Sequence, residues 1–216
     1  MRSEDQPRAA NRPTPESALR STRGPLIVVS GPSGVGKTTV VERLMADFDR
    51  PIRRVITATT RAPRPGETDG RDYYFWSPAA FEQAIADGRM LEHALVHETD
   101  YYGTPRAEVD PPRAAGVCVV AVIDVQGAET VRRLYPGDHL SIFLIPPTFA
   151  DLATRLRGRG ESEAGISKRL TTARAEIARA VEFDRVAFNA DVAAAARVLG
   201  VLIRRAFQEN EICTTT

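Results

Sequence analysis

The chain has 216 residues, a length typical of one globular domain with room for a small inserted subdomain. A domain of this size buries roughly 70% of the surface of its unfolded chain, so it needs no disulfide or metal for stability. Its 29 basic and 28 acidic residues nearly cancel, which argues against a nucleic-acid or membrane partner attracted by overall charge. Any anionic ligand must therefore be bound by locally placed donors.

Cysteine usage and hydropathy indicate a cytoplasmic protein. Cys118 and Cys213 show no paired spacing and are read as reduced thiols. No apolar run approaches the roughly 20 residues that span a bilayer, and the N-terminus has no hydrophobic signal segment. Residues 1–24 are rich in arginine and proline and poor in large apolar side chains, so we expect a disordered, dispensable tail. We expect residues 211–216 to be frayed.

Taken in chain order, the predicted elements alternate between strands and helices. The β-branched run Leu26–Val29 predicts a buried parallel strand, and Thr38–Phe48 has the apolar spacing of an amphipathic helix. Residues 55–104 interrupt the alternation with short runs rich in Thr, Tyr, Arg and Gly, and predict a small, mostly β insertion. Two further strands are predicted at 117–123 and 140–145, and four further helices at 128–134, 148–157, 163–181 and 191–208. This alternation predicts an α/β fold around a parallel sheet.

A glycine-rich segment lies between the first predicted strand and the first predicted helix. It fits the pattern G-x-x-x-x-G-K-[ST], in which backbone N–H groups surround phosphate oxygens at the positive end of a helix dipole. In this pattern Lys37 reaches the β- and γ-phosphates, and the Thr38 hydroxyl ligates Mg²⁺. The alternative is a chance glycine turn, against which the flanking strand and helix argue. The predicted ATP-binding residues of this segment are Gly31, Pro32, Ser33, Gly34, Val35, Gly36, Lys37, Thr38 and Thr39.

Asp124 comes directly after the strand predicted at 117–123. A carboxylate at the C-terminal end of a strand, beside a phosphate loop, can hold Mg²⁺ through water. Asp is equally suited to cap the N-terminus of a helix, and both readings stay open. None of the three histidines has the spacing of a protein-held metal site. These features together predict a P-loop phosphotransferase or NTPase.

Residues 57–75 carry the most informative pattern in the chain. Arg61 and Arg64 lie three apart among prolines, and their guanidinium groups suit a dianionic phosphate. Tyr73 and Tyr102 add hydroxyl donors that can reach the same group. Taken alone, two such arginines are more often ordinary surface residues.

This segment resembles the acceptor loop of guanylate kinases, S/T-x-T-T-R-x-P-R-x-G-E-x-x-G-x-x-Y. Met90–Ala94 is similar to the family's F-x-E-x-A motif, and Tyr101–Thr104 is similar to its Y-Y-G-T/S motif. Arg155–Gly160 and Lys168–Leu170 are similar to its lid, and Phe188–Asp191 is similar to its adenine-side motif. With the glycine-rich segment, the resemblance covers roughly residues 25–208, in the order of the family's motifs.

The resemblance implies a P-loop kinase core, made of a parallel sheet flanked by helices, at 25–54 and 105–208. It implies a small mixed α/β subdomain that binds the acceptor at about 55–104, and a helical lid at about 155–170. It further implies transfer of a phosphoryl group from ATP to GMP with Mg²⁺, in purine nucleotide metabolism. It leaves the oligomeric state undetermined.

By matched position, the resemblance also implies roles for individual residues. The implied GMP-binding residues are Thr57, Arg61, Arg64, Tyr73, Glu92, Tyr102 and Thr104. The implied catalytic residues are Lys37, Arg155, Arg159 and Arg169. The implied metal ligands are Thr38 and, through water, Asp124, and the resemblance implies that Asn189 lies near the ATP adenine. Glu92 would accept hydrogen bonds from N1–H and the 2-amino group of guanine. Adenine carries an acceptor at N1, so it would leave that carboxylate unpaired at a cost of about 1–3 kcal/mol or more.

Two departures from the family's pattern leave alternatives open. The family's D-x-D-x-Q-G has an acidic residue where this chain has Val122, so one acceptor for guanine is missing. The loop between Glu92 and Tyr102 is one residue longer than in the family's pattern. In this loop His97, Glu98 or Asp100 is either a substitute for the missing acid or an ordinary solvated charge. One alternative is therefore a kinase for another or a modified purine monophosphate. Another is a guanylate-kinase-like interaction module without activity, although such modules typically lose the phosphate loop, which is present here.

Overall fold

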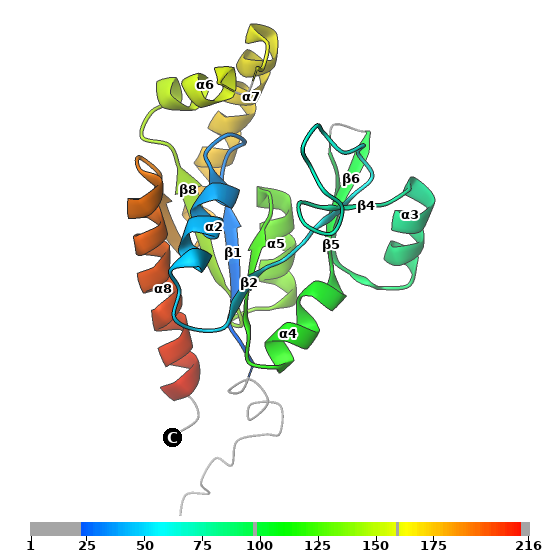
Figure 1. Cartoon of the computed structure of the whole chain (residues 1–216), viewed down its shortest axis with the longest axis vertical. Coiled ribbons are helices and arrows are strands. Elements are labelled where there is room, and N and C mark those ends of the chain that lie inside the picture. Colours follow the sequence, from blue (N-terminus) through cyan, green and yellow to red (C-terminus); the bar gives the residue numbers. More distant parts are fainter. Residues whose placement is uncertain (1–22, 97–98, 159, 213–216) are drawn as a thin grey trace, which may run out of the picture.

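The computed structural model describes residues 23–96, 99–158 and 160–212, and its core is a parallel sheet with helices on both faces (Figure 1). The sheet has five strands in the order β2-β7-β1-β8-β9, and every neighbouring pair is parallel. The strands are β1 (Leu26–Ser30), β2 (Ile52–Arg54), β7 (Cys118–Val122), β8 (Leu140–Ile145) and β9 (Arg185–Phe188). The predicted fold class, α/β around a parallel sheet, is confirmed.

Strand β1 is completely buried because its side chains alternate between two apolar layers. Ile27 and Val29 pack into a cluster that also contains Leu199, while Leu26 and Val28 pack into a second cluster on the opposite face. The first layer is covered by α2 (Lys37–Ala46) and α8 (Val192–Ile212), and the second by α4 (Asp110–Ala114) and α5 (Val125–Leu134). This packing on both faces holds the central strands in place, and their C-terminal ends lie at the edge of the sheet next to the glycine-rich segment.

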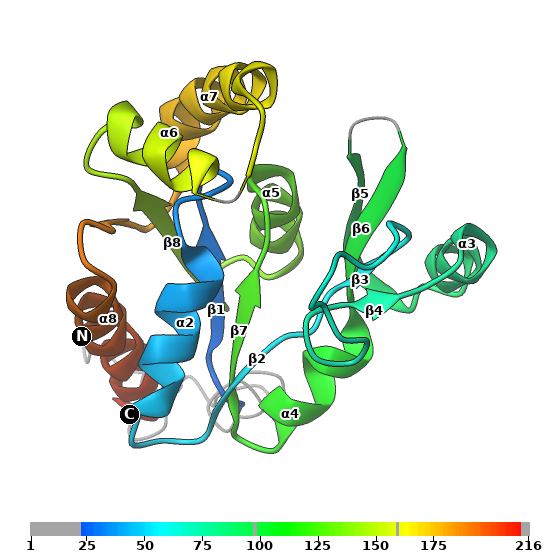
Figure 2. The same ribbon diagram turned by 45° about the horizontal axis from the view of Figure 1, so that its top comes forward.

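A second sheet lies in the predicted acceptor subdomain, the insertion at about 55–104, which stands beside the core in Figure 2. Its strand order is β4-β3-β6-β5. The strands are β3 (Ala58–Thr59), β4 (Tyr74–Phe75), β5 (Met90–Val96) and β6 (Asp100–Pro105), and helix α3 (Pro78–Ala86) packs against them. Ser77 caps α3 by accepting a hydrogen bond from the Ala80 N–H. Phe81 of α3 stacks on Tyr101 of β6, with ring centroids 5.2 Å apart.

One buried carboxylate ties this subdomain to the core. Glu108, in the 3-10 helix Arg106–Glu108, is 8% exposed. It accepts hydrogen bonds from Arg53 Nη2 (2.5 Å), the Ile56 backbone N–H (3.3 Å) and the Tyr74 hydroxyl (3.0 Å). These donors come from β2, from the connection that leaves the core, and from β4. Glu108 thus joins the outgoing and returning connections between the core and the second sheet.

The predicted lid, at about 155–170, falls within a pair of helices, α6 (Phe149–Arg157) and α7 (Glu163–Ala178), which lie over the end of the sheet next to the glycine-rich segment. Both helices have side-chain N-caps: the Thr148 hydroxyl accepts from Asp151 N–H, and the Ser162 hydroxyl from Gly165 N–H. A small apolar cluster of Leu152, Leu156, Ile166 and neighbouring residues joins the two helices. A further 3-10 helix, Arg179–Glu182, follows α7.

Several short elements were not predicted. Strands β2 and β9 have three and four residues, too few to show a clear hydrophobic period. Helix α4 begins with two prolines after Asp110, a pattern that reads as a chain breaker although proline fits the first helical turn. Helix α5 begins at Val125 rather than residue 128, α7 ends at Ala178 rather than 181, and α8 continues to Ile212 rather than ending at 208.

The predicted tail boundary also differs from the structure. Gly24 was assigned to the tail, but it is buried and its N–H donates to the Arg113 carbonyl oxygen (2.8 Å). A Cβ on Gly24 would lie 2.0 Å from the Val117 carbonyl oxygen, so only glycine fits there. The predictions for residues 1–22, His97, Glu98, Arg159 and residues 213–216 lie outside the described residues. Across the described ranges, no helix is both long enough and apolar enough to cross a bilayer.

Candidate active site

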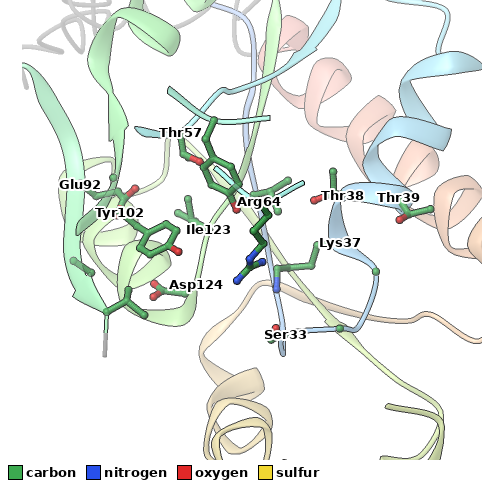
Figure 3. Close-up of a pocket in the computed structure, with 17 residues that line it drawn as sticks. Ser33, Lys37, Thr38, Thr39, Thr57, Arg64, Glu92, Tyr102, Ile123 and Asp124 are labelled. Carbon is green, nitrogen blue, oxygen red and sulfur yellow. The ribbon is translucent and has the colours of Figure 1, made fainter. Parts of the chain in front are cut away.

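A cavity of about 320 Å³ lies between the core, the glycine-rich segment and the acceptor subdomain (Figure 3). Three groups of residues line it: Ser33, Gly34, Gly36, Lys37, Thr38 and Thr39 from the glycine-rich segment, Thr57, Arg64, Tyr73, Glu92, Ala94, Val96, Tyr102 and Gly103 from the acceptor subdomain, and Val122, Ile123 and Asp124 from the end of β7. The charged ends of Lys37 and Arg64 extend into this space and lie near each other. The sequence-predicted phosphate loop and acceptor segment therefore share one cavity.

The glycine-rich segment turns sharply between β1 and α2. Gly36 directly precedes α2 with a φ of 96°, a left-handed conformation that favours glycine. A Cβ at Gly36 would lie 2.7 Å from Asn189 Nδ2, so the close packing beneath the loop also requires glycine. Lys37 Nζ donates to the Gly31 carbonyl oxygen at 2.6 Å and to the Pro32 carbonyl oxygen at 3.3 Å. These bonds hold the ammonium group across the loop.

Two side chains support the loop from behind. Asn189 Nδ2 and Arg155 Nη1 both donate to the Val35 carbonyl oxygen, at 2.7 and 2.9 Å. Arg155 Nη2 also donates to the Asn189 carbonyl oxygen at 2.7 Å. Asn189 is 1% exposed, and neither it nor Arg155 is among the cavity-lining residues. In this structure both residues therefore fix the shape of the loop, while their predicted contacts with ATP remain predictions.

The lid contributes further charged groups near the loop. Arg169 donates from Nη1 to the Ser33 hydroxyl oxygen at 2.8 Å, and its Nη2 pairs with Glu161 at 2.9 Å. Glu176 on α7 was not predicted as a site residue. Burial raises its pKa, nearby Lys37 opposes that rise, and Asp124 adds to it. These two helices thus place the guanidinium group of Arg169 and the carboxyl group of Glu176 close enough to interact with residues of the loop.

Asp124 is the N-cap of α5. Its Oδ1 accepts hydrogen bonds from the backbone N–H groups of Gln126 (3.0 Å) and Gly127 (2.8 Å). The helix-cap interpretation is therefore confirmed. Because the same residue also lines the cavity, the cap fixes its carboxylate at the site, and its predicted role toward Mg²⁺ stays a prediction.

Arg61 is held by a carboxylate that the sequence analysis did not single out. Its Nη1 and Nη2 pair with the two carboxylate oxygens of Glu67 at 2.9 and 3.0 Å, and its Nε donates to the Tyr102 hydroxyl at 3.1 Å. Glu67 also accepts from the Arg64 N–H at 2.7 Å. Burial alone would lower the pKa of Arg61, but the hydrogen bonds to Glu67 and Tyr102 raise it above its ordinary value. Arg61 stays charged and orients Tyr102, which lines the cavity.

Glu92 is the most deeply buried ionisable group of the cavity wall. It is 6% exposed, and its Oε1 accepts a hydrogen bond from Thr104 Oγ1 at 2.6 Å. Burial raises the pKa of Glu92 to about 7; the Thr104 bond opposes the rise, and Asp124 adds to it. Thr104 is completely buried and does not itself line the cavity. It therefore orients Glu92, and its contact with the base edge stays a prediction.

Part of the cavity wall is apolar. Val122, Ala94 and Val96 line the cavity, so the position at which the family's pattern has an acidic residue contributes an apolar side chain to it. Of the three suggested substitutes, only Asp100 lies within the described residues, and it is not among the lining residues. Its carboxylate accepts a hydrogen bond from the neighbouring Thr99 hydroxyl at 3.2 Å.

Comparison with known proteins agrees with this geometry. The family model for guanylate kinase matches residues 23–206. A guanylate kinase from Thiobacillus denitrificans is 47% identical over 169 residues, which cover 78% of this chain and 79% of that protein. A guanylate kinase from Listeria monocytogenes is 46% identical over 182 residues, covering 83% and 88%. The crystal structure of guanylate kinase from Anaplasma phagocytophilum has a TM-score of 0.72 at 31% identity, covering 86% and 87%.

Proposed function

The chain belongs to the guanylate kinase family, and we propose that it uses ATP to phosphorylate GMP, yielding GDP and ADP. The observation that carries this proposal is the shared cavity, in which Lys37 and Thr38 face Arg64, Tyr102 and Glu92. A phosphate loop alone predicts only a nucleotide triphosphate. The opposing guanidinium, hydroxyl and carboxylate groups supply what a purine monophosphate needs.

The acceptor side suits GMP at both of its ends. Arg64, Tyr73 and Tyr102 provide donors for the phosphate, and Arg61 orients Tyr102 from behind. The ionised carboxylate of Glu92 accepts hydrogen bonds from N1–H and the 2-amino group of guanine. Thr57 lies on the same wall and completes the edge that faces the base. GMP therefore spans the cavity from the arginines to Glu92.

Transfer requires positioning and charge stabilisation more than covalent chemistry. A phosphate oxygen of GMP attacks the γ-phosphorus of ATP in line with the departing ADP. This oxygen is already ionised, so no general base is needed. Lys37 and the lid arginines Arg155, Arg159 and Arg169 stabilise charge on the transferred group. Closure of the lid and the acceptor subdomain excludes water and suppresses ATP hydrolysis.

Mg²⁺ is the proposed companion of ATP. Among the described residues, no group of three or more His, Cys, Asp or Glu side chains could hold a metal ion. The two proposed ligands, the Thr38 hydroxyl and the Asp124 carboxylate, both line the cavity instead. This donor set fits a Mg²⁺ ion that keeps several waters and takes its other ligands from phosphates. When bound, the ion would neutralise charge on the phosphates.

The apolar wall at Val122 favours a second candidate, a kinase with broader purine selectivity. One carboxylate, rather than two, contributes to base recognition in this cavity. Because valine has no hydrogen-bond acceptor, a base that lacks a guanine donor on the side facing Val122 would leave no protein acceptor unpaired there. Such selectivity changes the acceptor but not the chemistry.

A coupled assay of ADP release, with ATP and Mg²⁺, separates these candidates. The acceptors to compare are GMP, dGMP, IMP, XMP, AMP and UMP. We expect a strong preference for GMP. Comparable turnover of IMP or XMP would favour the broader kinase, and ATP binding without transfer to any acceptor would contradict both and favour an interaction module.

A further inference from the structure

Gly127, in the first turn of α5, is a glycine whose backbone does not require one. Its φ lies outside the left-handed region, unlike those of Gly31, Gly34 and Gly36 in the phosphate loop. Alanine would be the better helix former at such a position. The reason for glycine must therefore be steric.

The neighbour that needs this space is Glu92. A Cβ on Gly127 would lie 2.8 Å from Glu92 Oε2 and 3.1 Å from Glu92 Cδ. The next nearest atom, Ile123 Cβ, is at 3.3 Å. We propose that Gly127 is a positioning residue for base recognition, because its missing side chain leaves the space occupied by the Glu92 carboxylate. This inference rests on the proposed function, in which that carboxylate binds guanine.

Neither partner can move aside without consequence. The N–H of Gly127 donates to Asp124 Oδ1, so the first turn of α5 is fixed by its own cap. On the other side, Glu92 Oε1 accepts from Thr104, which is completely buried. Glu92 and Thr104 are also paired across β5 and β6. The carboxylate is therefore held between a fixed hydroxyl and a fixed helix turn, and an added methyl group must displace it.

Gly103 shows why Gly127 is special. A Cβ on Gly103 would lie 2.6 Å from the Glu92 carbonyl oxygen, which belongs to the strand backbone. Substitution there would disturb the pairing of β5 with β6 and hence the fold. At Gly127 the obstructed atoms belong to a side chain, so the expected damage is to recognition. Gly127 also lies between the two halves of the site, since the space of its missing side chain adjoins Glu92 and its N–H donates to Asp124.

The test is Gly127→Ala in the full chain, with steady-state kinetics for both substrates. We expect the KM for GMP to rise about tenfold or more, since small misplacements at a site have effects of this order. The KM for ATP should change less than about twofold, because Asp124 keeps its cap. Gly200→Ala on α8 is the matched control: its nearest contacts are at 3.4 Å, which is ordinary van der Waals distance, so both KM values should stay unchanged. An unchanged KM for GMP, or equal rises for both substrates, would overturn the proposal.

A second variant separates steric displacement from general damage. Glu92→Asp shortens the side chain and removes the clash. If the two changes acted independently, the fold-loss of activity in the double variant would equal the product of the two single fold-losses; we expect it to be at least about fivefold smaller than that product. Strictly multiplicative losses would contradict the inference. If Gly127→Ala alone fails to fold, the double variant should recover the fold, as seen by circular dichroism. Failure to recover would also contradict it.

One readout is independent of the proposed reaction. Carbon-13 NMR of the Glu92 side-chain carboxyl, in the protein without nucleotides, should show a changed resonance in Gly127→Ala and an unchanged one in Gly200→Ala. If the wild-type protein fails to phosphorylate GMP but this resonance moves, the proposed function is wrong and the steric relation stands. If GMP is phosphorylated and the resonance does not move, the steric relation is wrong.

Discussion

Replacing Glu92 by glutamine should make the protein more stable at pH 8 while it loses recognition of the acceptor base. Glu92 is 6% exposed, and burial raises its pKa from the ordinary 4.5 to about 7. A carboxyl shifted this far costs the folded state about 3 kcal/mol when it is ionised. Glutamine carries no charge and keeps an oxygen that can accept from Thr104. It therefore removes that penalty.

The penalty depends on pH in a defined direction. Below pH 4.5 the carboxyl of Glu92 is protonated in the folded and unfolded chain alike, so no charge is buried. Between pH 4.5 and about 7 the unfolded chain releases the proton first, and the folded state loses relative stability. Above pH 7 the penalty is complete. The stability of Glu92→Gln should therefore exceed that of the wild type most clearly above pH 7.

Urea unfolding at pH 5 and pH 8 measures this difference in the free energy of unfolding. We expect a gain of about 1–3 kcal/mol at pH 8, because relaxation of the cavity wall reduces the full penalty, and a smaller gain at pH 5. In the same variant, kcat/KM for GMP should fall about a hundredfold, since an amide donor faces the guanine N–H groups. Glu82→Gln, at an exposed position on α3, should change neither quantity. A variant no more stable than the wild type at pH 8, or a gain independent of pH, would refute the reasoning.

Three further predictions concern the arginines and the acceptor carboxylate. Glu67→Gln should raise the KM for GMP about tenfold, because it breaks the paired contact that orients Arg61; kinetics at fixed ATP measure this, and an unchanged KM would contradict it. Arg155→Ala should lower kcat about a hundredfold, because it removes both the proposed positive charge near the transferred group and the bond that supports the loop at the Val35 carbonyl oxygen, while the Kd for GMP from calorimetry changes less than twofold; equal effects on both would exclude this role. The KM for GMP should rise about tenfold between pH 8 and pH 6 as Glu92 takes up its proton, and a flat profile would show that its charge is not needed.

The parts of the site that could be predicted from sequence are those whose residues lie close together in the chain. The phosphate loop combines a β-branched strand, three glycines and Lys37 within residues 26–38, so its spacing alone predicts its conformation. The acceptor segment is likewise local, and its position on the cavity wall agrees with the structure for Arg64 and Tyr73. Local patterns of this kind carry both the fold class and the chemistry.

What could not be predicted depends on contacts between distant residues. The bond from Arg155 to the Val35 carbonyl joins residues 120 positions apart, so no spacing rule reveals that the arginine supports the loop. Glu108 meets Arg53 across 55 positions, and its burial follows only from the crossing of two chain connections. Gly127 is a similar case, because the proposed reason for its missing side chain is Glu92, which lies on β5 in the second sheet while Gly127 lies on α5 of the core. Tertiary packing, not local preference, sets these roles.

Local pairing also explains how a chain with a formal net charge of +1 can serve two polyanionic substrates. Glu67 holds the guanidinium of Arg61, backbone carbonyls hold Lys37 and Arg155, and Glu161 holds Arg169. Each cation is thus oriented before any nucleotide binds, so the entropy of fixing a long side chain is lost on folding rather than on binding. Because selectivity then follows from the placement of donors and not from a surplus of charge, a small number of buried acceptors, with Glu92 foremost, is enough to choose the base.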